Sequence, residues 1–437
     1  MVLLRKGMLN RTGNMKYDLI VVGGGPAGLM AAKTAAEDGL RVVLVERKKY
    51  ITEVNRACLQ LLYIQKISPL EGGKTYMEPV TVDVGADASR FNFQTVGFSL
   101  DYQGSLRPYL NWIQVSPSGH QVHRFKLNDR IWGFNYDKES FLATLLHQAE
   151  KAGVEILPET AGVAAENTGD GVRISIRRER SRSLKTLEAK NAIAAEGVMS
   201  KIVQSLGLDY SRKAISTRIV KGAWYIIEGL ESPFPGNSLV SFTIPSFYAR
   251  NILIGMMPGN RNSITAGTLP YRQIAEHPAL APMLYKARVV KRLSFSNFVR
   301  APLLEPIVGN IIVAGDSAAP TETWMQGAVA CGYQAVKAIE KERAGGHGFR
   351  EYTAWWRQAF SFVNPSYFTV LSDGYALNRV CSDEEVDYVY RLLGDSVGIP
   401  AVLIDEKLER VKKERPGLYQ KLAGRTEQSM WQKQKEH

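Results

Sequence analysis

The chain has 437 residues, of which 45% are hydrophobic, enough for two or three domains with a sizeable core. Its three cysteines are too few for a disulfide framework and favour a reducing compartment, and no apolar run reaches the about 18 residues that a membrane span needs. The net charge of +12 is scattered and no nucleic-acid-binding module is visible, so we expect no nucleic-acid partner. Two interpretations of the charge stay open, solubility and contact with an anionic membrane surface.

Residues 1–15 contain too short an apolar stretch for a signal peptide, and we interpret them as a flexible N-terminus. Met15 is an alternative start of the chain. We therefore expect a cytoplasmic protein, with the inner face of the membrane as a second location if the basic surface contacts lipid.

A glycine-rich turn follows the first predicted strand. Residues 19–22 form an apolar run typical of a buried parallel strand, and Gly23, Gly25 and Gly28 follow it in G-x-G-x-x-G spacing. In this spacing the first glycine permits a tight turn, the second lets a pyrophosphate approach the backbone, and the third lets the next helix sit close to the strand. We assign the turn to Gly23, Gly25, Pro26, Ala27 and Gly28.

A second apolar strand ends at Glu46, 18 residues after Gly28. This spacing is close to the about 20 residues expected before the carboxylate that binds a ribose. An acid at this position favours an unphosphorylated ribose, so the pattern predicts FAD or NAD rather than NADP. The alternative is a glycine-rich turn in an ordinary α/β domain.

The segment that leaves the second strand of such a domain passes under the cofactor. Arg56 is therefore a candidate phosphate ligand, and Cys58 is a candidate to face a ring. The alternative is a surface arginine and a buried structural cysteine.

Two regions are rich in alternating apolar residues and predict strands, 73–135 and 217–300. One helix, around residues 272–288, interrupts the second region. A long mixed or antiparallel sheet of this kind is the usual platform for one wall of a ligand cavity.

Between these regions we expect a helix capped by Asp137 and ended by Gly153. A hairpin over residues 172–178 and 184–189 follows, with a basic tip that we interpret as solvated. A further strand ends in the turn at Glu196 and Gly197.

The second strong signal is a short buried strand over residues 309–314 that leads into Gly315 and Asp316. A small-residue helix then opens near Gly327 and Ala328. Asp316 can accept hydrogen bonds from a sugar-alcohol chain, and the helix amides can stabilise negative charge on a reduced flavin ring. The alternative is one more strand–helix unit with a capping aspartate.

Residues 346–437 predict helices, including one that opens with a capping box at Ser382. The mildly basic end of the chain either forms a helical cap on the sheet or touches lipid.

The motifs at residues 23–28, Glu46, 195–197 and 315–316 resemble those of flavoproteins of the para-hydroxybenzoate hydroxylase fold, and within it the geranylgeranyl reductase family. The resemblance covers roughly residues 16–345 and is specific for the fold and for FAD. It implies an α/β architecture with a Rossmann-like FAD-binding domain (16–72, 136–210 and 301–345), an inserted, mostly antiparallel β-sheet substrate domain (73–135 and 211–300) and a C-terminal helical region (346–437).

The resemblance also implies roles. Asp316 holds the ribityl chain and the loop from Trp324 to Gly327 runs along the ring, while Lys138 stands where the family usually has an FAD-binding arginine. Cys58 resembles a cysteine that prenyl reductases place near the flavin. The implied cofactor site is Gly23, Gly25, Pro26, Ala27, Gly28, Glu46, Arg56, Lys138, Gly315, Asp316, Gly327 and Ala328, with Cys58 and Trp324 as catalytic candidates and no metal.

Two departures from the family bear on function. Glu196 replaces the usual aspartate of the middle motif, which weakens a nicotinamide-site role for it. Leu253, Gly255 and Met257 occupy positions where prenyl reductases carry aromatic residues, so the substrate need not be a geranylgeranyl chain. No second dinucleotide turn follows a strand, so we expect reducing equivalents from docked NAD(P)H or a reduced ferredoxin-type protein donor.

We therefore predict an FAD-dependent oxidoreductase that reduces C=C bonds of a hydrophobic, isoprenoid-like substrate by hydride transfer from reduced flavin. The alternatives are an FAD-dependent aromatic monooxygenase, an electron-transfer flavoprotein that donates to a membrane quinone, and a non-catalytic FAD-binding scaffold. Three cysteines tell against an electron-transfer flavoprotein that carries its own iron–sulfur cluster.

Overall fold

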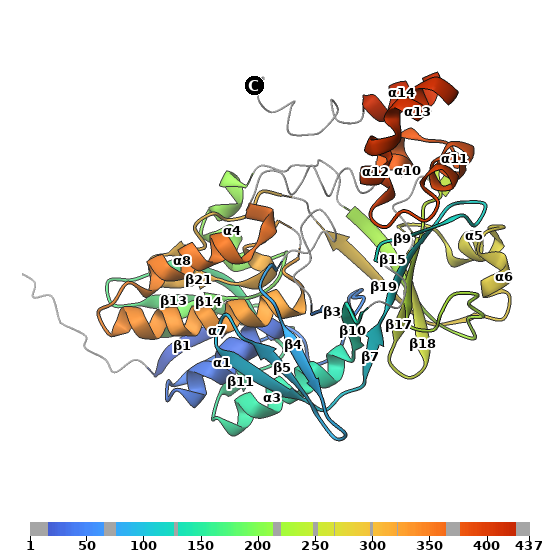
Figure 1. The fold of residues 1–437 in the computed structure, drawn as a ribbon. Helices are drawn as coiled ribbons and strands as arrows, with labels where there is room; N and C mark the ends of the chain where they lie inside the picture. Colours follow the sequence, from blue (N-terminus) through green and yellow to red (C-terminus); the bar gives the residue numbers. More distant parts are fainter. Residues whose placement is uncertain are drawn as a thin grey trace, which may run out of the picture.

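The computed structural model describes residues 16–64, 76–125, 130–212, 220–247, 252–265, 267–297, 300–320, 322–363 and 376–424. Figure 1 shows two large β-sheet units side by side, with a group of helices at the C-terminal end of the chain. The expectations for residues 1–15 and for the last thirteen residues of the basic tail lie outside the described ranges.

The first unit is built on parallel strands, and the residues of its central strands are almost entirely buried, as predicted for residues 19–22. Its parallel strands run in the order β11 (Glu155–Leu157), β2 (Val42–Val45), β1 (Tyr17–Val22), β14 (Lys185–Ala194) and β21 (Ile311–Val313). Helices α1 (Pro26–Glu37), α3 (Lys138–Lys151), α7 (Trp324–Arg343) and α8 (Gly348–Ala359) pack beside one another on this unit. The carboxyl ends of these five neighbouring strands therefore meet at one edge, where a ligand is expected.

Strand β14 has different partners along its length. Its first half pairs antiparallel with β13 (Val172–Arg178), which continues to β12 (Thr160–Asn167), and its second half pairs parallel with β1 and β21. The predicted hairpin is confirmed, with β14 extending five residues beyond the predicted end. The predicted strand over residues 309–314 is shorter in the structure, where β21 spans 311–313. Gly309, with a φ of +56°, lies instead in the turn between β20 (Ile307–Val308) and β21.

The second unit is a seven-stranded sheet, antiparallel except where β16 pairs with β8. Its order is β19 (Arg288–Asn297), β15 (Val220–Glu228), β18 (Arg261–Thr265), β17 (Ile252–Met257), β16 (Ser238–Phe242), β8 (Asn111–Val115) and β9 (Gln121–His123). The single helix predicted over residues 272–288 is wrong. It is two short helices, α5 (Tyr271–Glu276) and α6 (Ala281–Leu284), because Pro278 cannot continue the first helix and β19 already begins at Arg288.

Two small sheets join the large units. Strands β4 (Thr81–Val84), β5 (Ser89–Phe93) and β6 (Phe98–Tyr102) form one, and β3 (Leu61–Tyr63), β10 (Gly133–Tyr136) and β7 (Leu106–Tyr109) form the other. Although the sequence groups residues 89–102 with the substrate domain, Phe91, Phe93 and Tyr102 are buried in the same core as α1, α3 and α7. Aromatic stacking explains this placement, since Phe98 lies on Tyr333 of α7 at 4.6 Å.

The helical expectation for the C-terminal region is confirmed over residues 376–424. Its helices are α10 (Ala376–Val380), α11 (Asp383–Leu393), α12 (Pro400–Leu403), α13 (Leu408–Glu414) and α14 (Pro416–Ala423), and they enclose a core of their own. The capping box at Ser382 is present, with Glu385 as its partner. Asp387 accepts hydrogen bonds from Ser116 and Ser118 in the β8–β9 turn, which anchors these helices to the seven-stranded sheet. Within the described ranges, no helix has the length and apolarity needed to cross a membrane.

Candidate functional site

The turn between β1 and α1 has the geometry of an anion site. A Cβ at Gly23, whose φ is +108°, would lie 2.3 Å from the carbonyl oxygen of Ala195, and a Cβ at Gly28 would lie 1.7 Å from the oxygen of Gly23. Both positions therefore require glycine. A Cβ at Gly25 would meet no atom within 4 Å, so the space beside it is open. No side chain caps α1, and the free N–H groups of its first turn suit a pyrophosphate in that space.

Backbone hydrogen bonds hold Glu46 at the end of β2. Its carboxylate is buried, with Oε2 accepting from the Gly24 N–H at 2.5 Å and Oε1 accepting from the Lys48 N–H at 2.8 Å. Each oxygen has a second lone pair that suits a ribose hydroxyl. Burial lowers the pKa of the Lys48 ammonium, Glu46 opposes this shift, and the nearby Lys138 adds to it. Lys138 therefore lies close to this corner of the site.

The loop after β21 touches the first turn of α1. Gly315 has a φ of +63°, and a Cβ there would lie 3.1 Å from the Cβ of Ala27. Asp316 is half-buried in the short helix η3 (Gly315–Ser317), and its Oδ1 accepts hydrogen bonds from the backbone N–H of Thr323 at 2.7 Å and from its hydroxyl at 2.9 Å. The second oxygen of Asp316 suits a hydroxyl of a sugar-alcohol chain.

Helix α7 begins at Trp324, three residues before the predicted start near Gly327. Gly327 allows close packing, because a Cβ there would lie 2.8 Å from the ring of Phe360. Gly327 and Ala328 are buried in the first turn and a half of the helix. Because Thr323 is bonded to Asp316 and immediately precedes the helix, the helix N-terminus directly follows the Asp316 loop.

The candidate catalytic residues lie on adjoining segments. Arg56 Nη2 is 3.5 Å from Glu322 Oε1, and the ring of Trp324 stacks on Tyr63 at 4.7 Å. These contacts bring the chain around Cys58 alongside the start of α7. Trp324 has a φ of +59°, a conformation that is uncommon for bulky residues and clusters at functional sites.

Cys58 is half-buried and interacts with the hydroxyl of Tyr136. Burial raises the pKa of Tyr136 well above its ordinary value, and the neighbouring Cys58 raises it further. The phenol therefore stays protonated and is a hydrogen-bond donor next to this thiol.

Comparison with known proteins agrees with this geometry. Residues 18–51 match the family described as FAD dependent oxidoreductase, and residues 134–264 match the family described as FAD binding domain. The digeranylgeranylglycerophospholipid reductase of Methanothrix thermoacetophila is 23% identical over 79% of this chain and 84% of its own length. These matches show an FAD-dependent oxidoreductase that is similar to geranylgeranyl-type reductases.

Solved structures share the fold of this flavoprotein. The geranylgeranyl bacteriochlorophyll reductase-like protein of Thermoplasma acidophilum superposes with a TM-score of 0.62 at 17% identity, covering 94% of this chain and 99% of its own. The p-nitrophenol 4-monooxygenase of Pseudomonas putida gives a TM-score of 0.63 at 16% identity, covering 90% and 98%. The open turn at Gly25, the held carboxylate of Glu46 and the second oxygen of Asp316 all fit FAD.

The middle motif of this flavoprotein serves the scaffold. Burial raises the pKa of Glu196, and hydrogen bonds from the Ser200 hydroxyl and the backbone N–H groups of Lys201 and Ile202 oppose the rise. Glu196 thereby accepts hydrogen bonds from the first backbone N–H groups of α4 (Lys201–Ser205). Gly197 donates its N–H to the hydroxyl of Ser317 at 3.0 Å, which ties this turn to the Asp316 loop.

Arg212 is a residue that sequence reasoning missed. Its buried guanidinium donates four hydrogen bonds of 2.5–3.1 Å to carbonyl oxygens. The acceptors are Ala301, Ser317, Ala318 and Ala319. Burial lowers the pKa of Arg212 to about 9, neighbouring Arg300 adds to the shift, and Asp209 opposes it. Arg212 therefore stays a cation at neutral pH and fixes the loop that carries Asp316. No local sequence pattern marks it.

Gln60 was also missed. It is buried with a φ of +51°, its side-chain oxygen accepts from the Lys138 N–H at 2.6 Å, and its carbonyl accepts from the Tyr136 N–H at 3.0 Å. Gln60 thus fixes the chain just after Cys58 to β10 and to the start of α3.

An aromatic cluster extends from the start of α7 to the seven-stranded sheet. Its buried members are Tyr63, Tyr109, Phe125, Trp132, Leu239 and Met256, with Trp112 and Trp324 packed against them. Tyr109 fills the space beside Gly255, since a Cβ there would lie 3.1 Å from its hydroxyl, which also accepts the Met256 N–H at 2.8 Å. Aromatic side chains from other strands therefore pack beside positions 253–257, which carry none.

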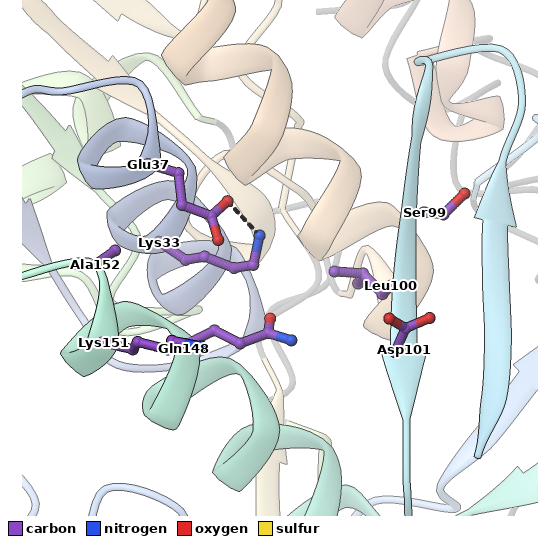
Figure 2. A pocket seen from close by; sticks show the side chains of 8 residues that line it. All are labelled: Lys33, Glu37, Ser99, Leu100, Asp101, Gln148, Lys151 and Ala152. Atoms are coloured by element: carbon purple, nitrogen blue, oxygen red, sulfur yellow. Dashed lines mark hydrogen bonds and ion pairs between the residues drawn. The ribbon is translucent and has the colours of Figure 1, made fainter.

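A separate hollow of about 400 Å³ lies between α1, α3 and β6 (Figure 2). It is bordered by Lys33 and Glu37, which form an ion pair of 2.6 Å at the far end of α1 from the glycine turn. The hollow is therefore distinct from the FAD-binding edge. In the part of the chain that the structure describes, no group of three or more His, Cys, Asp or Glu side chains is arranged to hold a metal.

Proposed function

We propose that this flavoprotein reduces carbon–carbon double bonds of a hydrophobic, isoprenoid-like substrate. The observation that carries the proposal is the aromatic cluster, which runs without a break from Trp324, beside the Asp316 loop, to the seven-stranded sheet. Most of the cluster is packed core, but Trp112 and Trp324 are half-buried at its edge. An apolar edge of this kind suits a hydrocarbon chain better than a small polar substrate. The name of the Methanothrix relative, a digeranylgeranylglycerophospholipid reductase, supports the same substrate class.

FAD, when bound, supplies hydride transfer to one alkene carbon. In this proposal the chain holds the cofactor through the Gly25 turn at the pyrophosphate, Glu46 at the ribose and Asp316 at the ribityl chain. Cys58 is our candidate to hold the proton for the second alkene carbon, because the hydroxyl of Tyr136 sits next to its sulfur. Trp324 borders the substrate side of the site.

The external reductant in this proposal is a transiently docked NAD(P)H or a reduced ferredoxin-type protein. One dinucleotide-binding turn is present among the described residues, and in this proposal FAD occupies it, so NAD(P)H has no such turn of its own there. We also propose that the protein is peripheral to a membrane, because its net charge of +12 and an apolar substrate both favour work at a lipid surface.

The test uses the FAD-loaded protein under anaerobic conditions. The flavin is reduced with dithionite and mixed with geranylgeranyl lipids in detergent. We expect the flavin absorbance to return with each turnover and mass spectrometry to show a gain of two hydrogens per reduced double bond. Cys58→Ser should slow product formation by roughly 10- to 1,000-fold, while Cys381→Ser, in the C-terminal helices, serves as the matched control.

Three outcomes contradict the proposal. If the flavin stays reduced with every lipid of a broad isoprenoid panel, isoprenoid lipids are excluded as the substrate class. An oxygenated product that forms only in air identifies an aromatic monooxygenase instead. Equal rates for the Cys58→Ser and Cys381→Ser variants remove the assigned role of Cys58.

A further inference from the structure

Two basic segments that are distant in sequence lie together at the carboxyl end of β2. Residues 47–50 and 177–185 hold eight Lys or Arg residues and one Glu. The backbone joins them through Glu159, whose N–H donates to the Lys48 carbonyl at 3.1 Å and whose carbonyl accepts the Glu179 N–H at 2.6 Å. The tip of the β13–β14 hairpin is therefore fixed beside the loop that follows Glu46.

Exposed apolar side chains lie among these cations. Tyr50 is 64% exposed in the first segment, and Leu184 is 57% exposed in the second. We call this region the hairpin-tip surface, and it consists of Arg47, Lys49, Tyr50, Arg178, Arg180, Arg182 and Leu184, all of which are exposed. Large exposed apolar residues flanked by cations are a feature of interaction sites.

The cations of the hairpin-tip surface differ from other exposed arginines of this protein. Arg41, Arg173 and Arg288 each form an ion pair with a carboxylate at 2.9, 3.0 and 2.5 Å. By contrast, no ion pair within 4 Å joins a cation of the hairpin-tip surface to any carboxylate in the described ranges. The nearby acids are the buried Glu46, which precedes Arg47, together with Glu159, Glu179 and Glu196. The cations of the two segments outnumber them.

The hairpin tip is also preformed. The Ser181 N–H donates to the Arg178 carbonyl at 3.0 Å, and the hydroxyls of Ser181 and Ser183 lie 2.9 Å apart. Arg180 has a φ of +63°, which favours glycine, so an arginine at this position is not explained by the stability of the turn. A rigid tip presents its cations without a further ordering step on binding.

We propose that the hairpin-tip surface docks onto an anionic lipid leaflet, with Tyr50 and Leu184 entering the interfacial layer and the cations facing lipid phosphates. An acidic protein would be matched by charge alone, whereas the paired exposure of a tyrosine and a leucine favours lipid. This docking surface rests on the peripheral membrane association proposed above and assigns it to named residues. Vesicle binding needs no turnover, so it is measured separately from the reduction of double bonds.

The experiment measures co-sedimentation of the full-length, FAD-loaded protein with phosphatidylcholine vesicles, with or without phosphatidylglycerol. We expect binding to the anionic vesicles only. The triple variant Arg178→Ser, Arg180→Ser, Arg182→Ser should weaken binding by roughly 100-fold, since each cation near an anionic surface contributes about a fivefold factor. The double variant Tyr50→Ser, Leu184→Ser should lose the part of the binding that persists at high salt.

The control is a second triple variant, Arg272→Ser, Lys286→Ser, Arg288→Ser, which removes the same charge from the far end of the seven-stranded sheet and should bind as the wild type does. All substituted residues are exposed, and FAD absorbance confirms folding. The proposal is overturned if the wild type ignores anionic vesicles or if both triple variants lose binding equally. It is also overturned if the apolar variant is indistinguishable from the wild type at every salt concentration, which would show that neither Tyr50 nor Leu184 enters the interfacial layer.

Discussion

Gly25 and Gly28 belong to one motif, but the structure gives them different tasks. A Cβ at Gly28 collides with the backbone of Gly23, whereas a Cβ at Gly25 enters open space. We therefore expect Gly25→Ala to fold with nearly unchanged stability and to weaken FAD binding by roughly 10- to 100-fold, as a methyl group displaces the pyrophosphate from its N–H donors.

Fluorescence titration with FAD and urea unfolding of the apoprotein measure the two effects separately. Gly169→Ala is the matched control, because a Cβ there also meets no atom within 4 Å but lies in the turn between β12 and β13. If Gly25→Ala binds FAD with normal affinity, the pyrophosphate does not bind at this turn.

Arg212 acts on the cofactor through the loop it holds. Arg212→Met leaves four carbonyl groups without their donor, and we expect a loss of about 3 kcal/mol or more in the free energy of unfolding together with weaker FAD binding. Arg173→Met removes an exposed arginine with two surface ion pairs, so it should change stability by about 1 kcal/mol or less. Similar urea midpoints for the two variants would show that the four bonds contribute little.

At the scale of elements, Asp387 couples α11 to the β8–β9 turn. Burial by itself would raise the pKa of the Asp387 carboxyl, but hydrogen bonds from Ser116 and Ser118 outweigh it and lower the pKa below its ordinary value of 3.8. The stabilisation is therefore fully present above pH 3.8 and is lost as the pH falls further through the folded-state value.

We expect Asp387→Ala to destabilise the C-terminal helices by about 1 kcal/mol at neutral pH and to have no effect below the folded-state pKa. Hydrogen exchange of the α11 amides at several pH values measures this. Asp395→Ala, an exposed acid two residues beyond the helix, is the control. A pH-independent difference between the two variants would contradict the role of the carboxylate.

At the scale of the whole molecule, FAD should stabilise the fold because its two glycine turns come from distant parts of the chain. At a free FAD concentration about 100 times the Kd, the expected gain is about 2.7 kcal/mol. Urea unfolding with and without FAD measures it. Gly25→Ala, with the roughly 10- to 100-fold weaker binding expected above, should keep about 0.4 to 1.4 kcal/mol of the gain at the same FAD concentration. A midpoint that does not move with FAD, in a protein without flavin absorbance, would contradict the cofactor assignment.

The sequence predicts those features that local sterics determine. The spacing of Gly23, Gly25 and Gly28 and the limits of β13 were predictable, because each depends on neighbours within a few residues. Arg212 and Gln60 were not, since their partners lie up to 107 residues away in the chain. The break at Pro278 was missed because the flanking residues alone favour a helix. The roles of individual residues at the flavin stay predictions.

The divided pairing of β14 has a consequence for how the protein is made. β1 lacks one of its two neighbouring strands until β14 emerges from the ribosome. β14 in turn lacks a pairing partner on one side until β21 follows at residues 311–313. Every strand of the seven-stranded sheet, by contrast, lies between residues 111 and 297. The seven-stranded sheet can therefore finish assembling while the parallel sheet of the first unit is still incomplete. FAD binding, which needs that parallel sheet, then comes late in biogenesis.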